Sequence, residues 1–186
     1  MDGGRADEHG FLVYSTTGRA FPCHTDLYRD RHPADLLLMK CVRADRGGGR
    51  TIIYKLRDLL ASLSPREISV LRRPSFPTEF GKIQLLSADS HGYSIRYNRR
   101  EIDFFARLRR EPLSARQSEV LNKIDLLLAN GKERQEFLLQ PGQCIVINNK
   151  TVLHGRTRLS KGTKRLLKRI RLPARPRLRG LNLVAN

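Results

Sequence analysis

The chain has 186 residues, of which 39% are hydrophobic, and this length and composition indicate one globular domain. Its 36 lysine and arginine residues exceed 18 acidic ones, giving a net charge of +18. No run of 18 apolar residues occurs, which disfavours a spanning helix, and no membrane partner is expected. Three scattered cysteines exclude a disulfide framework, and the polar N-terminus is unlike an export signal, so the expected location is the cytoplasm.

The N-terminal part of the chain predicts short strands followed by helices. Residues 1–10 are rich in glycine and charge and are expected to be disordered. Short apolar runs bounded by glycine or charged residues predict strands at 11–14, 36–42 and 51–54. A helix should cover residues 55–63, and a second should run from the Ser64 capping box, with Pro65 in its first position, to Leu71.

The second half of the chain continues the same pattern of short strands. Strands are predicted at 82–86, 93–98, 136–139, 144–150 and 165–172, and one longer helix at 115–129, between Ser114 and the Asn130-Gly131 stop. The predicted fold is therefore mainly β with flanking helices, an antiparallel sandwich or barrel. The domain is expected to cover residues 11–172, and residues 173–186 form a basic tail rich in proline and arginine.

Three residues suggest a metal site. His24 and Asp26 form a His-x-Asp pattern, and on a strand residues i and i+2 point to the same face, so both side chains could bind one cation. His154, expected in a turn just after the strand at 144–150, could supply a third ligand. Two histidines and one carboxylate on one side of a metal are the ligand set of non-haem Fe(II) oxygenases.

Several short motifs occur in a characteristic order along the chain. They are Phe21-Pro22-Cys23-His24-Thr25-Asp26, the turn Gly47-Gly48-Gly49-Arg50-Thr51, Pro141-Gly142 before a strand ending in Asn148-Asn149, and Leu153-His154-Gly155-Arg156 followed by Arg165 and Arg169. Over roughly residues 11–172 this order resembles the TauD/TfdA and clavaminate-synthase-like Fe(II)/2-oxoglutarate dioxygenases. The resemblance implies a double-stranded β-helix, or jelly roll, with Fe(II) bound by His24, Asp26 and His154 and with 2-oxoglutarate as cosubstrate.

The resemblance also implies roles for residues that hold the organic ligands. Arg165 matches the arginine that pairs with the distal carboxylate of 2-oxoglutarate, and Thr51 matches the hydroxyl that helps to hold it. A planar guanidinium can bind a carboxylate through two parallel hydrogen bonds, which suits the first role. Arg169 matches an arginine that contacts the substrate's acidic group or the 1-carboxylate, and Arg96, on the alternating strand at 93–98, could also face the pocket.

The function implied is hydroxylation, or a related oxidation, of a C–H bond in a small polar substrate. That small molecule would be an amino acid or a derivative in natural-product metabolism, dioxygen would be consumed, and succinate and CO2 would be formed. The alternative is a basic nucleic-acid-binding or scaffold protein on a catalytically silent jelly roll, which the charge of +18 favours. A nucleic-acid partner is nevertheless not expected, because no known nucleic-acid motif occurs and aromatic residues make up only 6% of the chain.

The position of the His-x-Asp pattern close to the first residue departs from the family. Relatives usually carry a longer segment before it, which walls the pocket. One side of the jelly roll would then be uncovered, and exposed sheet edges and apolar faces tend to be covered by another chain. We therefore expect either a homo-oligomer that covers the missing N-terminal wall or a pocket that is open to solvent.

Overall fold

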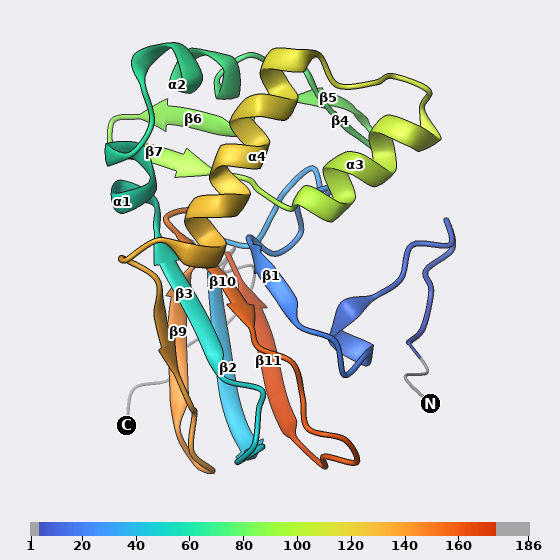
Figure 1. Cartoon of the computed structure of the whole chain (residues 1–186), viewed down its shortest axis with the longest axis vertical. Coiled ribbons are helices and arrows are strands. Elements are labelled where there is room, and N and C mark those ends of the chain that lie inside the picture. The colour runs from blue at the N-terminus through green and yellow to red at the C-terminus, as the bar shows by residue number, and fades with distance from the viewer. Residues whose placement is uncertain (1–3, 174–186) are drawn as a thin grey trace, which may run out of the picture.

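The computed structural model describes residues 4–173, whose strands form two main antiparallel sheets (Figure 1). One sheet has the order β1-β10-β3-β8, with the bounds Phe21–His24, Val152–Arg156, Thr51–Lys55 and Gln135–Phe137. The other has the order β11-β2-β9, with the bounds Leu166–Leu172, Leu36–Arg43 and Cys144–Asn148. The prediction of a mainly β fold with helices is confirmed.

A layer of four α-helices and two hairpins lies at one end of these sheets, and all of these elements are inserted between β3 and β8 (Figure 1). The helices are α1 at Leu56–Ala61, α2 at Pro65–Leu71, α3 at Arg99–Leu108 and α4 at Ala115–Asn130. The hairpins pair β4 at Phe76–Thr78 with β5 at Gly81–Ile83, and β6 at Leu86–Asp89 with β7 at Gly92–Ile95.

The main apolar core joins this inserted layer to the four-stranded sheet. It contains side chains from the sheet, such as Ile52, Tyr54 and Leu153, together with buried residues of α1, α3 and α4. A second, smaller cluster of Leu37, Met39 and Ile147 lies on the three-stranded sheet. The insertion therefore stabilises the sheet that carries β1 and β10, because it removes apolar surface of that sheet from water.

Two helix starts agree closely with the sequence. The Ser64 hydroxyl accepts a hydrogen bond from the backbone N–H of Glu67, and the Ser64 backbone N–H donates the reciprocal bond to the Glu67 carboxylate. Pro65 is the first residue of α2. Ser114 forms the same kind of capping box with Gln117 at the start of α4. Both helices begin where predicted because these caps pair backbone N–H groups that the helix itself leaves without partners.

Other expected elements differ from the structure. Residues 11–14 are not a strand, since only an isolated bridge joins Ala6 to Leu12 and Tyr14–Thr16 forms a short 3-10 helix. The strand expected at 82–86 is divided between β5 and β6, and the strand expected at 93–98 ends at Ile95. Asn98 instead caps α3, a helix that the sequence analysis did not predict.

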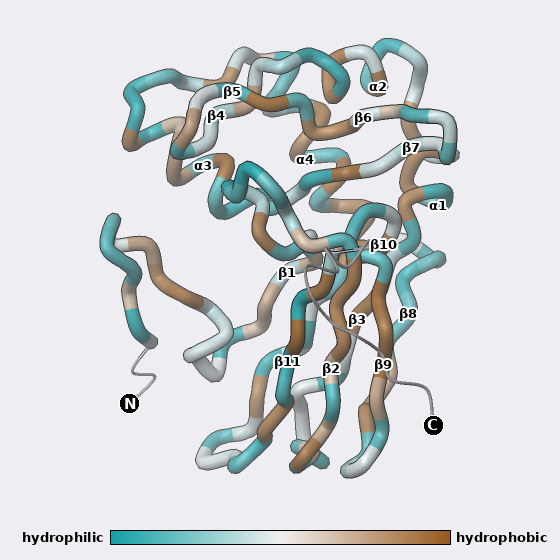
Figure 2. The backbone as a smooth tube through the Cα atoms, turned by 180° about the vertical axis from the view of Figure 1, so that it is seen from behind, coloured by the Kyte–Doolittle hydropathy of each residue, from teal (hydrophilic) through white to brown (hydrophobic). Residues whose placement is uncertain are grey.

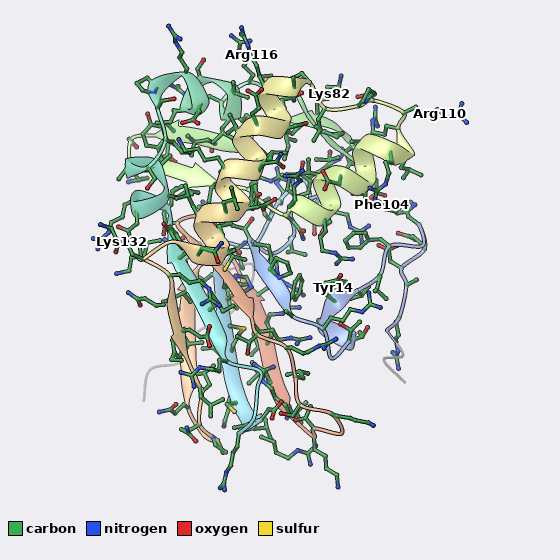
Figure 3. All side chains as sticks on the ribbon, viewed as in Figure 1. Tyr14, Lys82, Phe104, Arg110, Arg116 and Lys132 are labelled. Carbon is green, nitrogen blue, oxygen red and sulfur yellow. The ribbon has the colours of Figure 1, made fainter. Side chains whose placement is uncertain are left out.

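The segment before β1 packs against α3 through aromatic contacts. The Arg100 guanidinium lies 3.3 Å from the centre of the Tyr14 ring, and the rings of Phe11 and Phe104 meet edge to face at 5.1 Å. Figure 3 shows Tyr14 and Phe104 on this side of the molecule. Residues 4–10, expected to be disordered, are also held, since Asp7 forms a 2.8 Å ion pair with Arg29. Residues 1–3 and, apart from residue 173, the expected basic tail lie outside the described residues.

The three-stranded sheet presents apolar side chains to solvent. Figure 2 shows apolar stretches along β11, β2 and β9, and four exposed residues there are Leu166, Ile170 and Leu172 of β11 and Val146 of β9. One edge of β11 pairs with no other strand of the described chain. Within residues 4–173, no helix is both long and apolar enough to cross a membrane.

Candidate metal centre

The two neighbouring strands β1 and β10 bring together histidines from opposite ends of the sequence. Their antiparallel register places His24, the last residue of β1, directly opposite His154. His154 therefore lies inside a strand rather than in the turn that the sequence analysis expected. The predicted same-face geometry of His24 and Asp26 on one strand is also wrong, because β1 ends at His24 and Asp26 lies in the turn that follows.

The turn after β1 is fixed by Asn149, a residue to which the sequence analysis gave no role. Its side-chain oxygen accepts from the backbone N–H of Asp26 at 2.8 Å, and its amide nitrogen donates to the carbonyls of Asp26 and Ala34. Leu27, next in the chain, has a φ of 59°, a left-handed conformation that costs a non-glycine residue about 1–2 kcal/mol. The buried Asn149 clamp thus holds a strained turn that points Asp26 at the histidines.

The three side chains form a compact, buried cluster whose ligand atoms all lie within 4.8 Å of one another. Asp26 Oδ1 is 3.4 Å from Nε2 of His24 and 3.4 Å from Nε2 of His154. The His24 ring stacks on Phe21, and its Nδ1 lies 2.9 Å from the carbonyl of Pro22, which fixes the ring and leaves Nε2 facing the cluster. These donors fit a divalent iron, for which two imidazoles and a carboxylate are suitable ligands.

Both ring nitrogens of His154 are buried and lack a hydrogen-bond partner among the described residues. The 3.4 Å approach of Nε2 to Asp26 is short enough for an electrostatic contact but does not have hydrogen-bond geometry. A buried polar atom without a partner costs about 1–3 kcal/mol, so such atoms are rare unless a ligand satisfies them. The His154 nitrogens are therefore the observation that fits a bound metal best.

The protonation states of the cluster also suit a metal. Burial, together with the nearby His24, lowers the pKa of His154 to about 4, so this imidazole is neutral at pH 7. Burial by itself would raise the pKa of Asp26, but the contacts with His154 and His24 and the charge of Arg169 hold that pKa well below its usual range. A neutral imidazole and an ionised carboxylate are the forms that coordinate cations.

Two arginines of β11 hold the Asp26 carboxylate from the other side. Arg169 Nη1 lies 3.0 Å from Oδ1 and 2.9 Å from Oδ2, and Arg171 Nε lies 2.7 Å from Oδ2. Arg169 was singled out in the sequence for a ligand contact, whereas Arg171 was not. Arg171 lies two residues after Arg169 on a strand, so both side chains are on one face. This spacing is the signal that could have identified Arg171.

A cavity of about 280 Å³ opens beside the two histidines and contains the residues expected to hold the cosubstrate. Thr51, Arg165 and Arg169 line it together with His24 and His154. Thr51 is buried at the start of β3, and Arg165, just before β11, is half-buried. Gly49 is needed there, because it has a φ of +62° and a Cβ would lie 2.7 Å from Arg165 Cδ.

The structure does not bring Arg96 to this site. Its guanidinium donates to the backbone carbonyls of Tyr28 and Asp30, and Arg96 does not line the cavities that contain His24. The expected placement failed because β7 ends at Ile95, so the alternating pattern does not continue to residue 96. Arg96 instead stabilises the segment that follows Asp26.

Gly155 allows β1 and β10 to approach closely, and Gly155→Ala should disrupt the metal centre. A Cβ at this position would lie 2.5 Å from the carbonyl oxygen of Phe21 and 3.0 Å from the amide nitrogen of Cys23, both backbone atoms. We expect a loss of about 1–3 kcal/mol in the free energy of unfolding, as for other overpacked sites, and weaker metal binding. Chemical denaturation and metal titration measure the two effects. Unchanged values for both would show that β1 can move away without cost.

Comparison with known proteins identifies the family. The family model of the taurine catabolism dioxygenase TauD, TfdA family matches residues 3–171. The chain belongs to this family. The resemblance noted in the sequence is thereby confirmed. Two of its motifs, at residues 21–26 and 153–156, supply the metal cluster, and Thr51, Arg165 and Arg169 line the adjoining cavity.

Individual relatives of this TauD/TfdA chain are distant. L-lysine 3-hydroxylase from Catenulispora acidiphila is 24% identical over 132 residues, which are 66% of this chain and 36% of that protein. An asparagine oxygenase solved with Fe(II), 3-hydroxyasparagine and succinate matches with a TM-score of 0.72 and 22% identity, over 85% of this chain and 51% of that one. The non-haem iron oxygenase OrfP, solved with Fe and α-ketoglutaric acid, matches with a TM-score of 0.64 and 19% identity, over 84% and 50%.

These structural matches show that the fold is shared with iron oxygenases. The chain spans about half the length of the solved relatives and 36% of the lysine hydroxylase. The family match at residues 3–171 contains His24, Asp26 and His154 and all the strands of the two sheets except the last residue of β11.

Proposed function

We propose that this chain binds Fe(II) and 2-oxoglutarate and takes part in the hydroxylation of an amino acid or a close derivative. The observation that carries the proposal is the buried group of His24, Asp26 and His154, in which the His154 nitrogens lack hydrogen-bond partners. Bound iron would supply the activation of dioxygen and the oxidation of a C–H bond, coupled to the conversion of 2-oxoglutarate to succinate and CO2.

Each residue of the site has a distinct role in this proposal. His24, Asp26 and His154 hold the metal from one side, which leaves the opposite side open to ligands. Arg165 and Thr51 bind the distal carboxylate of 2-oxoglutarate within the 280 Å³ cavity. Arg169 orients the Asp26 carboxylate and offers its remaining donors to a carboxylate of the cosubstrate or substrate.

We also propose that the two sheets are those of a double-stranded β-helix. Along the chain β1, β2 and β3 alternate between the four-stranded and the three-stranded sheet, and so do β8, β9, β10 and β11. A chain that passes repeatedly from one antiparallel sheet to the other winds as a jelly roll does. The insertion between β3 and β8 then lies at the end of the barrel where β1 and β10 carry the histidines.

The choice of an amino acid as substrate rests on the relatives and on the charge of the site. The relatives are named for lysine and asparagine, and OrfP has been solved with L-Arg. Arginine and acidic side chains both line a cavity beside His24 and Asp26, so a zwitterion would find groups of both signs there. Neither a purely anionic nor a purely cationic lining would suit such a molecule.

An anaerobic titration tests the proposed function directly. Fe(II) added to the chain in the presence of 2-oxoglutarate should produce a weak visible charge-transfer band, which is absent when either ligand is left out. Aerobic incubation with a panel of amino acids, assayed for succinate, would then identify the substrate. If no band forms and the chain instead binds RNA or DNA in a strongly salt-dependent way, the alternative of a basic binding protein is favoured.

The homo-oligomer that was expected to cover the missing N-terminal wall remains a prediction, and we propose that it is a dimer formed through β11. The unpaired edge of β11 and the exposed Ile170 and Leu172 form a surface that tends to associate with another chain. We expect sedimentation equilibrium at micromolar concentration to show a dimer and Ile170→Lys to shift it toward monomer. Leu126→Lys, at an exposed position of α4, is the matched control. A monomer at every concentration would contradict this prediction.

A further inference from the structure

A second cavity, of about 240 Å³, also adjoins the metal cluster. Its walls come from the segment before β1, the turn after β1, the start of α3 and β11. His24 and Asp26 line it, and so do Asn98 and Glu101 at the start of α3. A molecule bound in this cavity would contact residues of the metal centre, so its contents matter for the reaction.

The positive charges that line this cavity already have partners. Arg29 pairs with Asp7, and Arg169 and Arg171 pair with Asp26. Arg100 donates to the carbonyl of Leu12 and lies over the Tyr14 ring. The acidic groups are paired in the same contacts, except for the exposed Asp30 and for Glu101.

Glu101 has one carboxylate oxygen that nothing in the described chain satisfies. Oε1 accepts a hydrogen bond from Asn98 Nδ2 at 2.8 Å, whereas Oε2 is buried and lacks a partner. Burial raises the pKa of Glu101, and the neighbouring acids Asp26 and Asp7 add to that effect, although Arg29 and His24 oppose it. A buried carboxylate oxygen in this state gains most from a cationic donor.

We propose that Glu101 is a specificity-determining residue whose Oε2 binds a protonated nitrogen of the substrate. The inference rests on the proposed function and adds to it a requirement for an ammonium or guanidinium group in the substrate. An ammonium carries three donors and no acceptor, so it can satisfy Oε2 and neutralise the carboxylate together. An anionic group at this position would be repelled by Glu101 and Asp26. The bond would hold the substrate in the cavity that His24 and Asp26 line.

Calorimetric titration with three probes tests the proposal. The probes are L-lysine, L-norleucine, which lacks the side-chain ammonium, and 6-aminohexanoate, which lacks the α-ammonium. Glu101→Gln keeps the shape of the side chain and its contact with Asn98 but removes the charge. We expect this variant to bind L-lysine about tenfold to a hundredfold more weakly than wild type, the range for one charged hydrogen bond. Glu119→Gln, at an exposed position of α4, is the matched control and should bind as wild type does.

The probes also tell which nitrogen Glu101 binds. If wild type prefers L-lysine to L-norleucine and Glu101→Gln loses that preference, the side-chain nitrogen is bound. If the lost preference is for L-lysine over 6-aminohexanoate, the α-nitrogen is bound. Glu101→Asp keeps the charge and should retain the preference. Thermal unfolding of Glu101→Gln and Glu101→Asp separates lost binding from lost folding.

The titrations are performed under anaerobic conditions with and without Fe(II) and 2-oxoglutarate. Equal lysine affinity in wild type and Glu101→Gln, or no binding of any probe by wild type, would overturn the role of Glu101. Formation of the charge-transfer band in the same samples would leave the proposed function standing. Conversely, lysine binding that depends on Glu101 in a chain that forms no band would support the subsite and contradict the proposed function.

Discussion

Replacing His24 or His154 with alanine is expected to abolish iron binding at the cluster. Each change removes one of three buried ligands, and the loss should exceed the roughly tenfold to hundredfold effect of removing a hydrogen-bond partner of a ligand. Because the His154 nitrogens have no hydrogen-bond partner within residues 4–173, His154→Ala without metal should cost only the lost packing of its ring. Iron analysis after anaerobic loading, with circular dichroism for the fold, measures both effects.

Asp26→Ala should also lose iron but differs in its effect on stability. Asp26 is the counter-charge of Arg169 and Arg171, and removing one partner of a buried ion pair leaves the others uncompensated. We therefore expect a lower free energy of unfolding for Asp26→Ala than for the histidine variants. His91→Ala, at an exposed position, is the control for histidine removal. Full iron occupancy in the His24 and His154 variants would refute the ligand assignment.

Arg165→Ala is expected to weaken the binding of 2-oxoglutarate by about 1.5–3 kcal/mol, roughly tenfold to more than a hundredfold. A charged, paired hydrogen bond in a half-buried cavity is lost. Thr51→Val removes only a neutral donor of similar volume and should cost about 0.5–1.5 kcal/mol. Titration of the charge-transfer band with 2-oxoglutarate gives both affinities.

The control for charge removal is Arg116→Ala. Arg116 is an exposed residue of α4, and Figure 3 shows it at the periphery of the molecule, as it does Lys82, Arg110 and Lys132. Arg116→Ala lowers the net charge as much as Arg165→Ala does, but Arg116 does not line the cavity. A larger effect of Thr51→Val than of Arg165→Ala would reverse the proposed roles of the two residues.

The sequence predicted best those elements whose signals are local. Ser64 and Ser114 predict the starts of two helices, because a capping box depends only on residues three positions apart. The start of α3 carries a similar local signal, since Asn98 accepts from the backbone N–H of Glu101, but the alternating residues 93–98 suggested a strand instead. The two-residue alternation therefore favoured a strand at the position where Asn98 caps the helix.

The site could be predicted as a set of residues but not as a geometry. The motifs identified His24, Asp26 and His154 together, yet the assumed strand through Asp26 was wrong. The actual position of Asp26 depends on Asn149, and no periodicity relates that side chain to the turn it clamps. Arg96 was misplaced for the converse reason, because a local alternation was extended past the end of β7.

The metal centre joins residues that are very far apart along the chain. Asp26 is held by Asn149, 123 positions later, and by Arg171, 145 positions later. Contacts of such long range form slowly, because the entropy of closing a large loop is lost before any contact compensates it. The centre therefore assembles only when β10 and β11 have docked onto strands made much earlier. Iron that arrives afterwards would bind only the fully folded chain and would stabilise it by mass action.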